Sequence, residues 1–158
     1  MITSEDKAYL IQCIELAKKA LKNGDEPFGS ILVSANGDIL VEDHNHVSGG
    51  DQTQHPEFAI ARWAAAHLTT EERKTTTVYT SGEHCPMCAA AHGLVGLGRI
   101  VYASSSKQLR EWKKEMGLAP GNLYPLGIKD VVKTISVDGP DEELAGEVKR
   151  LHVQKHTR

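Results

Sequence analysis

The chain has 158 residues, of which 40% are hydrophobic and 25% charged, and its formal net charge is −3 at pH 7. This composition is typical of one globular domain and excludes an intrinsically disordered chain. The acidic balance disfavours tight binding to duplex nucleic acid, and neither a membrane-length apolar run nor a signal-peptide core is found, so we expect a cytoplasmic protein with no membrane partner.

Hydrophobic periodicity predicts helices that alternate with strands. In chain order we expect a helix over 4–23, strands over 28–34 and 38–45, a helix over 56–67, a strand over 76–80, a helix over 86–97, a strand over 99–103, a short helix over 108–116, a strand over 131–137 and a helix over 141–155. Asn36-Gly37, between the first two strands, is a strong β-hairpin signal. This order of elements indicates an α/β domain whose mixed sheet is covered by helices on both faces.

Three cysteines, an odd number, do not make a disulfide framework. Cys85 and Cys88 form a C-x-x-C pair at the start of a predicted helix, where free N–H groups and the helix dipole stabilise thiolates. His55 lies just before a different helix, and together the three residues supply nitrogen and sulfur ligands of the kind that zinc prefers. A structural zinc site takes four protein ligands, so a set of three predicts one position open to water. Cys13, near the apolar stripe of the first helix, is expected in the core.

Glu57 follows His55 by two residues, inside the first turn of the predicted helix. A carboxylate at this spacing is able to face a metal-bound water without binding the metal itself. Because zinc lowers the pKa of bound water toward about 7, such a site also needs a group that takes and returns protons. Glu57 is therefore the predicted general acid and base.

The pattern H-x-E followed by C-x-x-C is the signature of zinc deaminases, and the sequence resembles the cytidine deaminase-like superfamily. Within it, the chain is most similar to the small bacterial branch that includes guanine, cytosine and tRNA adenosine deaminases. The resemblance covers nearly the whole chain. It includes Pro27-Phe28-Gly29 at the first strand, Asn45 at the end of the second strand, and residues 79–83, which lead to the cysteines.

The resemblance implies a three-layer α/β/α sandwich with a mixed five-stranded sheet, and a single zinc-dependent deaminase domain over residues 1–158. It implies one Zn²⁺ per chain, held by His55, Cys85 and Cys88, with Glu57 as the proton shuttle. Asn45 would hydrogen-bond the base and Phe28 would line the pocket. Because relatives are commonly dimers, we expect a homodimer.

Two residues depart from the family's usual pattern. His84 replaces a proline before the first cysteine, and Pro56 replaces an alanine or valine between the histidine and the glutamate. We expect His84 either to contact substrate or simply to replace a loop residue. Trp112 is a further candidate for the pocket, by its position after the fourth strand, against ordinary packing. His152, near the carboxyl end of the chain, is expected on the surface.

Three functions follow from these features. The first is hydrolytic deamination of a small aminated nucleobase or nucleoside, with guanine, cytosine and related bases all open. The second is deamination of adenosine in tRNA, for which the last helix carries Lys149, Arg150, Lys155 and Arg158, diluted by Glu142, Glu143 and Glu147. The third is a non-catalytic zinc-binding assembly domain, against which the proton-shuttle glutamate argues. The acidic balance favours the small substrate and no nucleic acid.

Overall fold

The computed structural model describes residues 1–157, so that Arg158, the last residue of the predicted domain, lies outside the described part. The elements are α1 (Ser4–Lys22), β1 (Gly29–Val33), β2 (Ile39–His44), a 3₁₀ turn η1 (Val47–Gly49), α2 (Pro56–His67), α3 (Thr70–Lys74), β3 (Thr77–Gly82), α4 (Pro86–Val95), β4 (Arg99–Ser104), α5 (Ser106–Glu115), α6 (Ile128–Val131), β5 (Val137–Asp138) and α7 (Glu142–His156).

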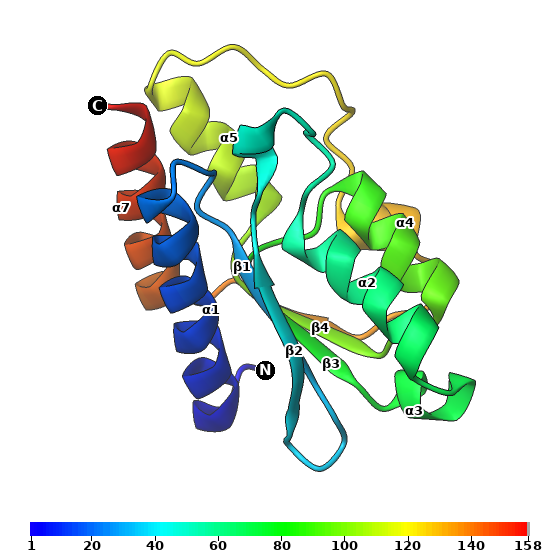
Figure 1. The fold of residues 1–158 in the computed structure, drawn as a ribbon. Helices are drawn as coiled ribbons and strands as arrows, with labels where there is room; N and C mark the ends of the chain where they lie inside the picture. The colour runs from blue at the N-terminus through cyan, green and yellow to red at the C-terminus, as the bar shows by residue number, and fades with distance from the viewer. Residues whose placement is uncertain (158) are drawn as a thin grey trace.

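The five strands form one mixed sheet in the order β2-β1-β3-β4-β5. Strand β1 is antiparallel to both of its neighbours, whereas β3, β4 and β5 are parallel. Helices α1 and α7 cover one face of this sheet, and α2 and α4 cover the opposite face (Figure 1). The expected three-layer α/β/α arrangement with a mixed five-stranded sheet is therefore confirmed.

Each face of the sheet has its own hydrophobic core. The apolar stripe predicted on the first helix is buried and packs with β1, β3, β4 and α7; its members are Leu10, Ile14, Ala17 and Leu21. Cys13 is fully buried in the same cluster, as expected. On the opposite face, Ile60, Ala61 and Ala64 of α2 pack against Leu32 and Val78 of the sheet. The small side chains of α2 allow this helix to lie close to the sheet.

The predicted strand over 131–137 is wrong for most of its length. Residues 128–131 form the short helix α6, and only Val137 and Asp138 pair with β4. Val132 and Ile135, between these two elements, are partly buried against Ile100 and Ile128 but lie in irregular backbone. Their apolar pattern reports burial against this small core rather than pairing in the sheet.

Two further boundaries differ from the prediction. The helix α3 was not expected, although Thr69 and Glu72 form a capping box at its start. The helix predicted over 86–97 ends at Val95, because Gly96 adopts the left-handed conformation with φ of +79° and donates its N–H to His92 O. A glycine in this conformation is a common helix terminator.

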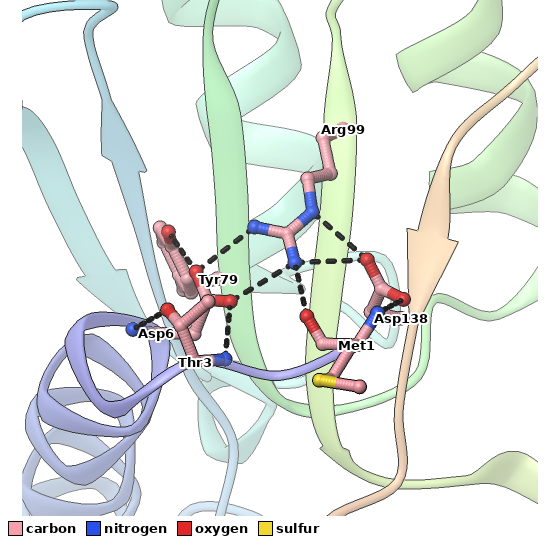
Figure 2. Close-up of polar contacts among 6 residues, drawn as sticks. All are labelled: Met1, Thr3, Asp6, Tyr79, Arg99 and Asp138. Carbon is pink, nitrogen blue, oxygen red and sulfur yellow. Dashed lines mark hydrogen bonds and ion pairs between the residues drawn. The ribbon is translucent and has the colours of Figure 1, made fainter.

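A network of charged groups joins the start of α1 to the sheet (Figure 2). Arg99 of β4 donates to Asp6 of α1 at 2.9 Å and to Asp138 of β5 at 2.8 Å. Tyr79 of β3 donates its hydroxyl to Asp6 at 2.7 Å, and the amino group of Met1 lies 2.6 Å from Asp138. These contacts join α1 to β3, β4 and β5 near the first residues of β3 and β4.

No helix within residues 1–157 combines the length and the hydropathy that a membrane crossing requires.

Candidate metal centre and active site

The candidate site lies at the edge of the sheet where β3 ends and β1 begins. These two ends meet because β1 and β3 are antiparallel neighbours. Two helices begin near this edge with the same local pattern. His55 is the N-cap of α2 and Cys85 is the N-cap of α4, and a proline follows each at the first helical position. Proline fits this position because its missing N–H has no partner there in any helix.

The three predicted metal ligands lie together. His55 Nδ1 is 3.5 Å from Cys85 Sγ and 3.6 Å from Cys88 Sγ, and the two sulfur atoms are 3.6 Å apart. A tetrahedral zinc ion with its usual bond lengths places such ligand atoms about 3.6–3.8 Å from one another. The donor set and its spacing therefore fit one zinc ion, as predicted for His55, Cys85 and Cys88.

The two cysteines differ in acidity. The pKa of Cys85 is lowered to about 4, because its hydrogen bonds with Cys88 and His55 together outweigh the effect of burial. The pKa of Cys88 is raised by its hydrogen bond with Cys85 and by burial. A bound cation would favour the thiolate form of both cysteines.

Glu57 lies beside these ligands with its carboxylate held by the sheet. Its Oε1 is 2.8 Å from Ser30 Oγ and 3.0 Å from Thr80 Oγ1, and both hydroxyls are buried and placed to donate. Burial raises the pKa of Glu57, although the hydrogen bond from Ser30 opposes this. The pKa of His55 is raised by its hydrogen bond with Cys85 and also by the nearby charge of Glu57, so the carboxylate lies close to the metal ligands.

Ser30 and Thr80 were not singled out in the sequence. The only signal was a polar residue inside each of two short apolar strands, and this does not show which side chain the hydroxyl meets. In the structure the two residues are directly paired across β1 and β3.

Asn45 and Phe28 lie on neighbouring backbone segments at the same edge. The N–H of Asn45 donates to Phe28 O at 3.0 Å, and Asn45 Oδ1 accepts from the N–H of Val47 at 3.0 Å. Asn45 is 2% exposed. The Phe28 ring packs beside Gly82, the last residue of β3, where a Cβ would lie 3.1 Å from Phe28 Cε1. Gly82 therefore makes room for the ring three residues before Cys85.

His84 and Trp112 are both buried, in different places. His84 precedes Cys85 and is 1% exposed, with its ring centroid 5.5 Å from that of His92 and no hydrogen-bond partner for either ring nitrogen. Trp112 of α5 packs in the core under α1 and α7. His152 of α7, expected on the surface, is 1% exposed and lies beside Trp112. That expectation was wrong because α7 presents this residue to the sheet side.

Residues 3–104, which include all three metal ligands and Glu57, match the family described as cytidine and deoxycytidylate deaminase zinc-binding region. The chain belongs to this family. Membership assigns zinc to the cluster of His55, Cys85 and Cys88.

The names of the curated relatives of this deaminase give different substrates. The chain is 33% identical over 122 residues to a probable cytosine deaminase of Schizosaccharomyces pombe, covering 75% of this chain and 72% of the relative. It is 32% identical over 102 residues to a tRNA-specific adenosine deaminase of Bacillus subtilis, covering 64% of this chain and 63% of the relative. The second match thus spans less than two thirds of that relative's length.

A solved guanine deaminase from Nitrosomonas europaea shares the deaminase fold over the whole chain. Its TM-score is 0.71, with 18% sequence identity, and the match covers 100% of this chain and 87% of that one. At this identity the likeness shows the fold alone. The substrate of this family member must therefore be argued from the residues of its own site.

Proposed function

We propose that this deaminase family member is a zinc-dependent enzyme that hydrolyses the exocyclic amine of a small aminated nucleobase or nucleoside and releases ammonia. The observation that carries the proposal is the buried Glu57 beside a three-ligand zinc site. A non-catalytic zinc domain has no use for a carboxylate that two sheet hydroxyls hold at the metal.

In the proposed reaction, bound zinc supplies a Lewis acid that lowers the pKa of a water molecule and leaves one coordination position for it. Glu57 accepts one proton of the attacking water and donates it to the ring nitrogen next to the amine. It then accepts the second proton, from the new hydroxyl group on the carbon, and donates it to the amine, which leaves as ammonia. The raised pKa of Glu57 suits this work, because a carboxyl group that shuttles protons must gain them as well as lose them.

Ser30 and Thr80 hold Oε1 of Glu57, so that Oε2 is left for proton transfer. Asn45, Phe28, His84 and Trp112 are proposed to bind the base. For Asn45 and Phe28, the support is their place at the sheet edge that carries the metal ligands. His84 and Trp112 are buried at that edge and in the adjoining core, and their contact with a base stays a prediction.

The small substrate is favoured over tRNA by charge. The net charge of −3 supplies little attraction for an RNA backbone, and Lys149 of the last helix is already paired with Glu115 at 3.3 Å. Deamination of adenosine in tRNA is the alternative, because several curated relatives carry that activity by name. The proposal also includes a cytoplasmic location and a homodimer, and sedimentation of the purified chain tests the dimer.

The test is ammonia release from cytosine, guanine, adenine and their nucleosides, and from a tRNA anticodon stem, with zinc-loaded protein. Glu57→Gln is expected to lower kcat by about 10³-fold or more while zinc content stays at one per chain, because the substitution removes the proton shuttle and no ligand. Cys13→Ala, in the core of the opposite face, is the control and should keep its activity.

Reaction of the tRNA stem alone would replace the small-base proposal with the tRNA one. Release of no ammonia from any substrate would favour the assembly domain.

A further inference from the structure

The ring of His152 is a polar group without a polar partner in the interior of the protein. It lies on α7, is 1% exposed, and its Nδ1 has no hydrogen-bond partner among the described residues. Two other buried histidines also have unpaired ring nitrogens: His84 has no partner for either nitrogen, and His92 pairs only Nε2, at 2.7 Å from Gly98 O. Buried polar atoms are normally paired, because an unpaired one has lost water without replacement. Nδ1 of His152 is therefore available to a ligand, and its place between the rings of Phe28 and Trp112 distinguishes it from the unpaired nitrogens of the other two histidines.

The rings around His152 come from two other elements. Its ring centroid is 5.2 Å from that of Phe28, in an edge-to-face arrangement at 65°, and 6.1 Å from that of Trp112. Phe28 precedes β1, Trp112 belongs to α5 and His152 to α7, so three segments distant in sequence converge here. Flat aromatic surfaces with one hydrogen-bonding group are a common way to hold a flat heterocycle.

Phe28 connects this aromatic cluster to the metal site. Its carbonyl accepts from the N–H of Asn45, and its ring packs beside Gly82, three residues before Cys85. Two residues after Phe28, Ser30 contacts Glu57. The cluster of Phe28, Trp112 and His152 thus lies at the same edge of the sheet as the metal ligands, on the side of α5 and α7.

His152 is held in its neutral form. The pKa of His152 is lowered to about 3, mainly by burial and also by the nearby positive charge of Lys113. A neutral imidazole has one N–H donor and one acceptor nitrogen, which suit an uncharged heterocycle and not a phosphate group. The chemistry of this residue therefore matches a free base better than the charged part of a nucleotide.

We infer that His152 is a specificity-determining residue, whose Nδ1 hydrogen-bonds a ring nitrogen or carbonyl of the base on the side away from the reacting amine, within a wall formed by Phe28 and Trp112. The inference rests on the proposed deaminase function and deepens it. Because His152 is closed off in the structure, the Phe28 ring must shift when the base enters. Neither the family match nor the metal geometry assigns a role to this residue.

The test compares two variants of His152 on paired substrates. His152→Phe keeps the ring and removes the hydrogen-bonding atoms, and His152→Gln keeps a group that donates and accepts. Each is assayed on the base that the wild type deaminates best and on analogues of it in which one ring nitrogen or carbonyl away from the amine is replaced by CH. We expect His152→Phe to lower kcat/KM for the true base at least about tenfold, mainly through KM, with unchanged zinc content.

The decisive result is the loss of discrimination. On the analogue that lacks the recognised atom, wild type and His152→Phe should have the same low kcat/KM. His152→Gln should keep part of the wild-type preference for the true base over this analogue. Binding of the true base to zinc-loaded Glu57→Gln protein, with and without His152→Phe, should show the same fall in affinity by calorimetry. This measurement does not depend on turnover.

Val148→Ala is the matched control. Val148 is fully buried on α7, one turn before His152, so this change loosens the packing of the helix without touching Nδ1. It should lower thermal stability and leave the preference between base and analogue unchanged. Equal preference in wild type and His152→Phe, or the same loss of preference in Val148→Ala, would overturn the inference. If wild-type protein deaminates none of the bases, the proposed function itself has failed.

Discussion

The carboxylate of Asp6 is a buried charge whose contribution to stability depends on pH. Burial alone would raise its pKa, but hydrogen bonds from Arg99, the N–H of Thr3 and Tyr79 outweigh burial and hold the pKa well below its usual range. A carboxyl group with a lowered pKa stabilises the folded state fully above its unfolded pKa, near 3.9. This contribution is lost as the pH falls toward the folded pKa, because the unfolded chain takes up the proton first.

We expect Asp6→Asn to lower the free energy of unfolding by about 2 kcal/mol at pH 7. The difference from wild type should persist down to about pH 4 and shrink as the pH falls further. Urea unfolding of both proteins between pH 7 and pH 2 measures it. Glu5→Gln, at the exposed neighbouring position, is the control and should change stability by less than about 0.5 kcal/mol. A difference that grows on acidification would contradict this account.

Single residues of the site were predictable to unequal degrees. His55, Glu57, Cys85 and Cys88 are close in sequence to helix starts, and their chemistry is specific, so the pattern alone brought them together. The environment of His152 could not be predicted, because the neighbours that bury it belong to segments more than thirty residues away in sequence. A histidine near a chain end carries no signal of which helix face meets the core.

At the scale of elements, β1 lies so close to α1 that one position accepts only glycine. A Cβ on Gly29 would lie 2.5 Å from Leu16 Cβ and 2.8 Å from the backbone nitrogen of Ala17. Since Gly29 also follows Phe28 at the site edge, a shift of β1 would reach both Phe28 and Ser30. The close approach of this strand and helix thus fixes the edge on which Glu57 depends.

We expect Gly29→Ala to lower the free energy of unfolding by about 3 kcal/mol, since packed backbone and side chain must move apart. Gly146→Ala on α7 is the matched control, because no atom lies within 4 Å of the added Cβ. It should raise stability by up to about 1 kcal/mol through helix propensity. Thermal unfolding of the two variants measures the contrast, and similar effects from both would show that the contact with α1 is unimportant.

Elements were predicted well where a local signal agreed with tertiary packing. The first helix has a capping box at Thr3 and a continuous apolar stripe, and the structure contains both. Residues 131–137 have β-branched side chains that favour a strand locally, but their tertiary packing does not place them in the sheet. Only their last residue pairs with β4, and the others fill the space beside Ile100. Strand pairing depends on a neighbour that periodicity does not identify.

At the scale of the whole molecule, zinc should join α2 to α4, since its ligands come from the starts of both helices. Ligand binding to the folded state alone stabilises it by about 4 kcal/mol when free zinc is a thousandfold above Kd. For a chain of this size, removal of zinc by a chelator should therefore lower Tm by about 10 °C. Differential scanning calorimetry with and without chelator measures the change.

Two variants separate the metal from general packing. Cys88→Ala should remove the response of Tm to zinc and chelator, because only two ligands remain. Cys13→Ala, which opens a small cavity on the opposite face, should lower Tm yet keep the full response. A Cys88→Ala protein whose Tm still rises with zinc would show that the metal is held elsewhere.

The pairing of Ser30 with Thr80 across β1 and β3 links the sheet to the chemistry in one more way. Side chains alternate between the faces of a strand, so a slip of one residue would turn one of these hydroxyls away from Glu57. Because Cys85, Cys88 and His55 lie at helix starts, we expect them to bind zinc even in a chain whose strand register is shifted. Metal content therefore reports the assembly of the helices, whereas turnover reports the register of the sheet. The ratio of activity to bound zinc therefore measures the fraction of a preparation whose sheet has folded in its native register.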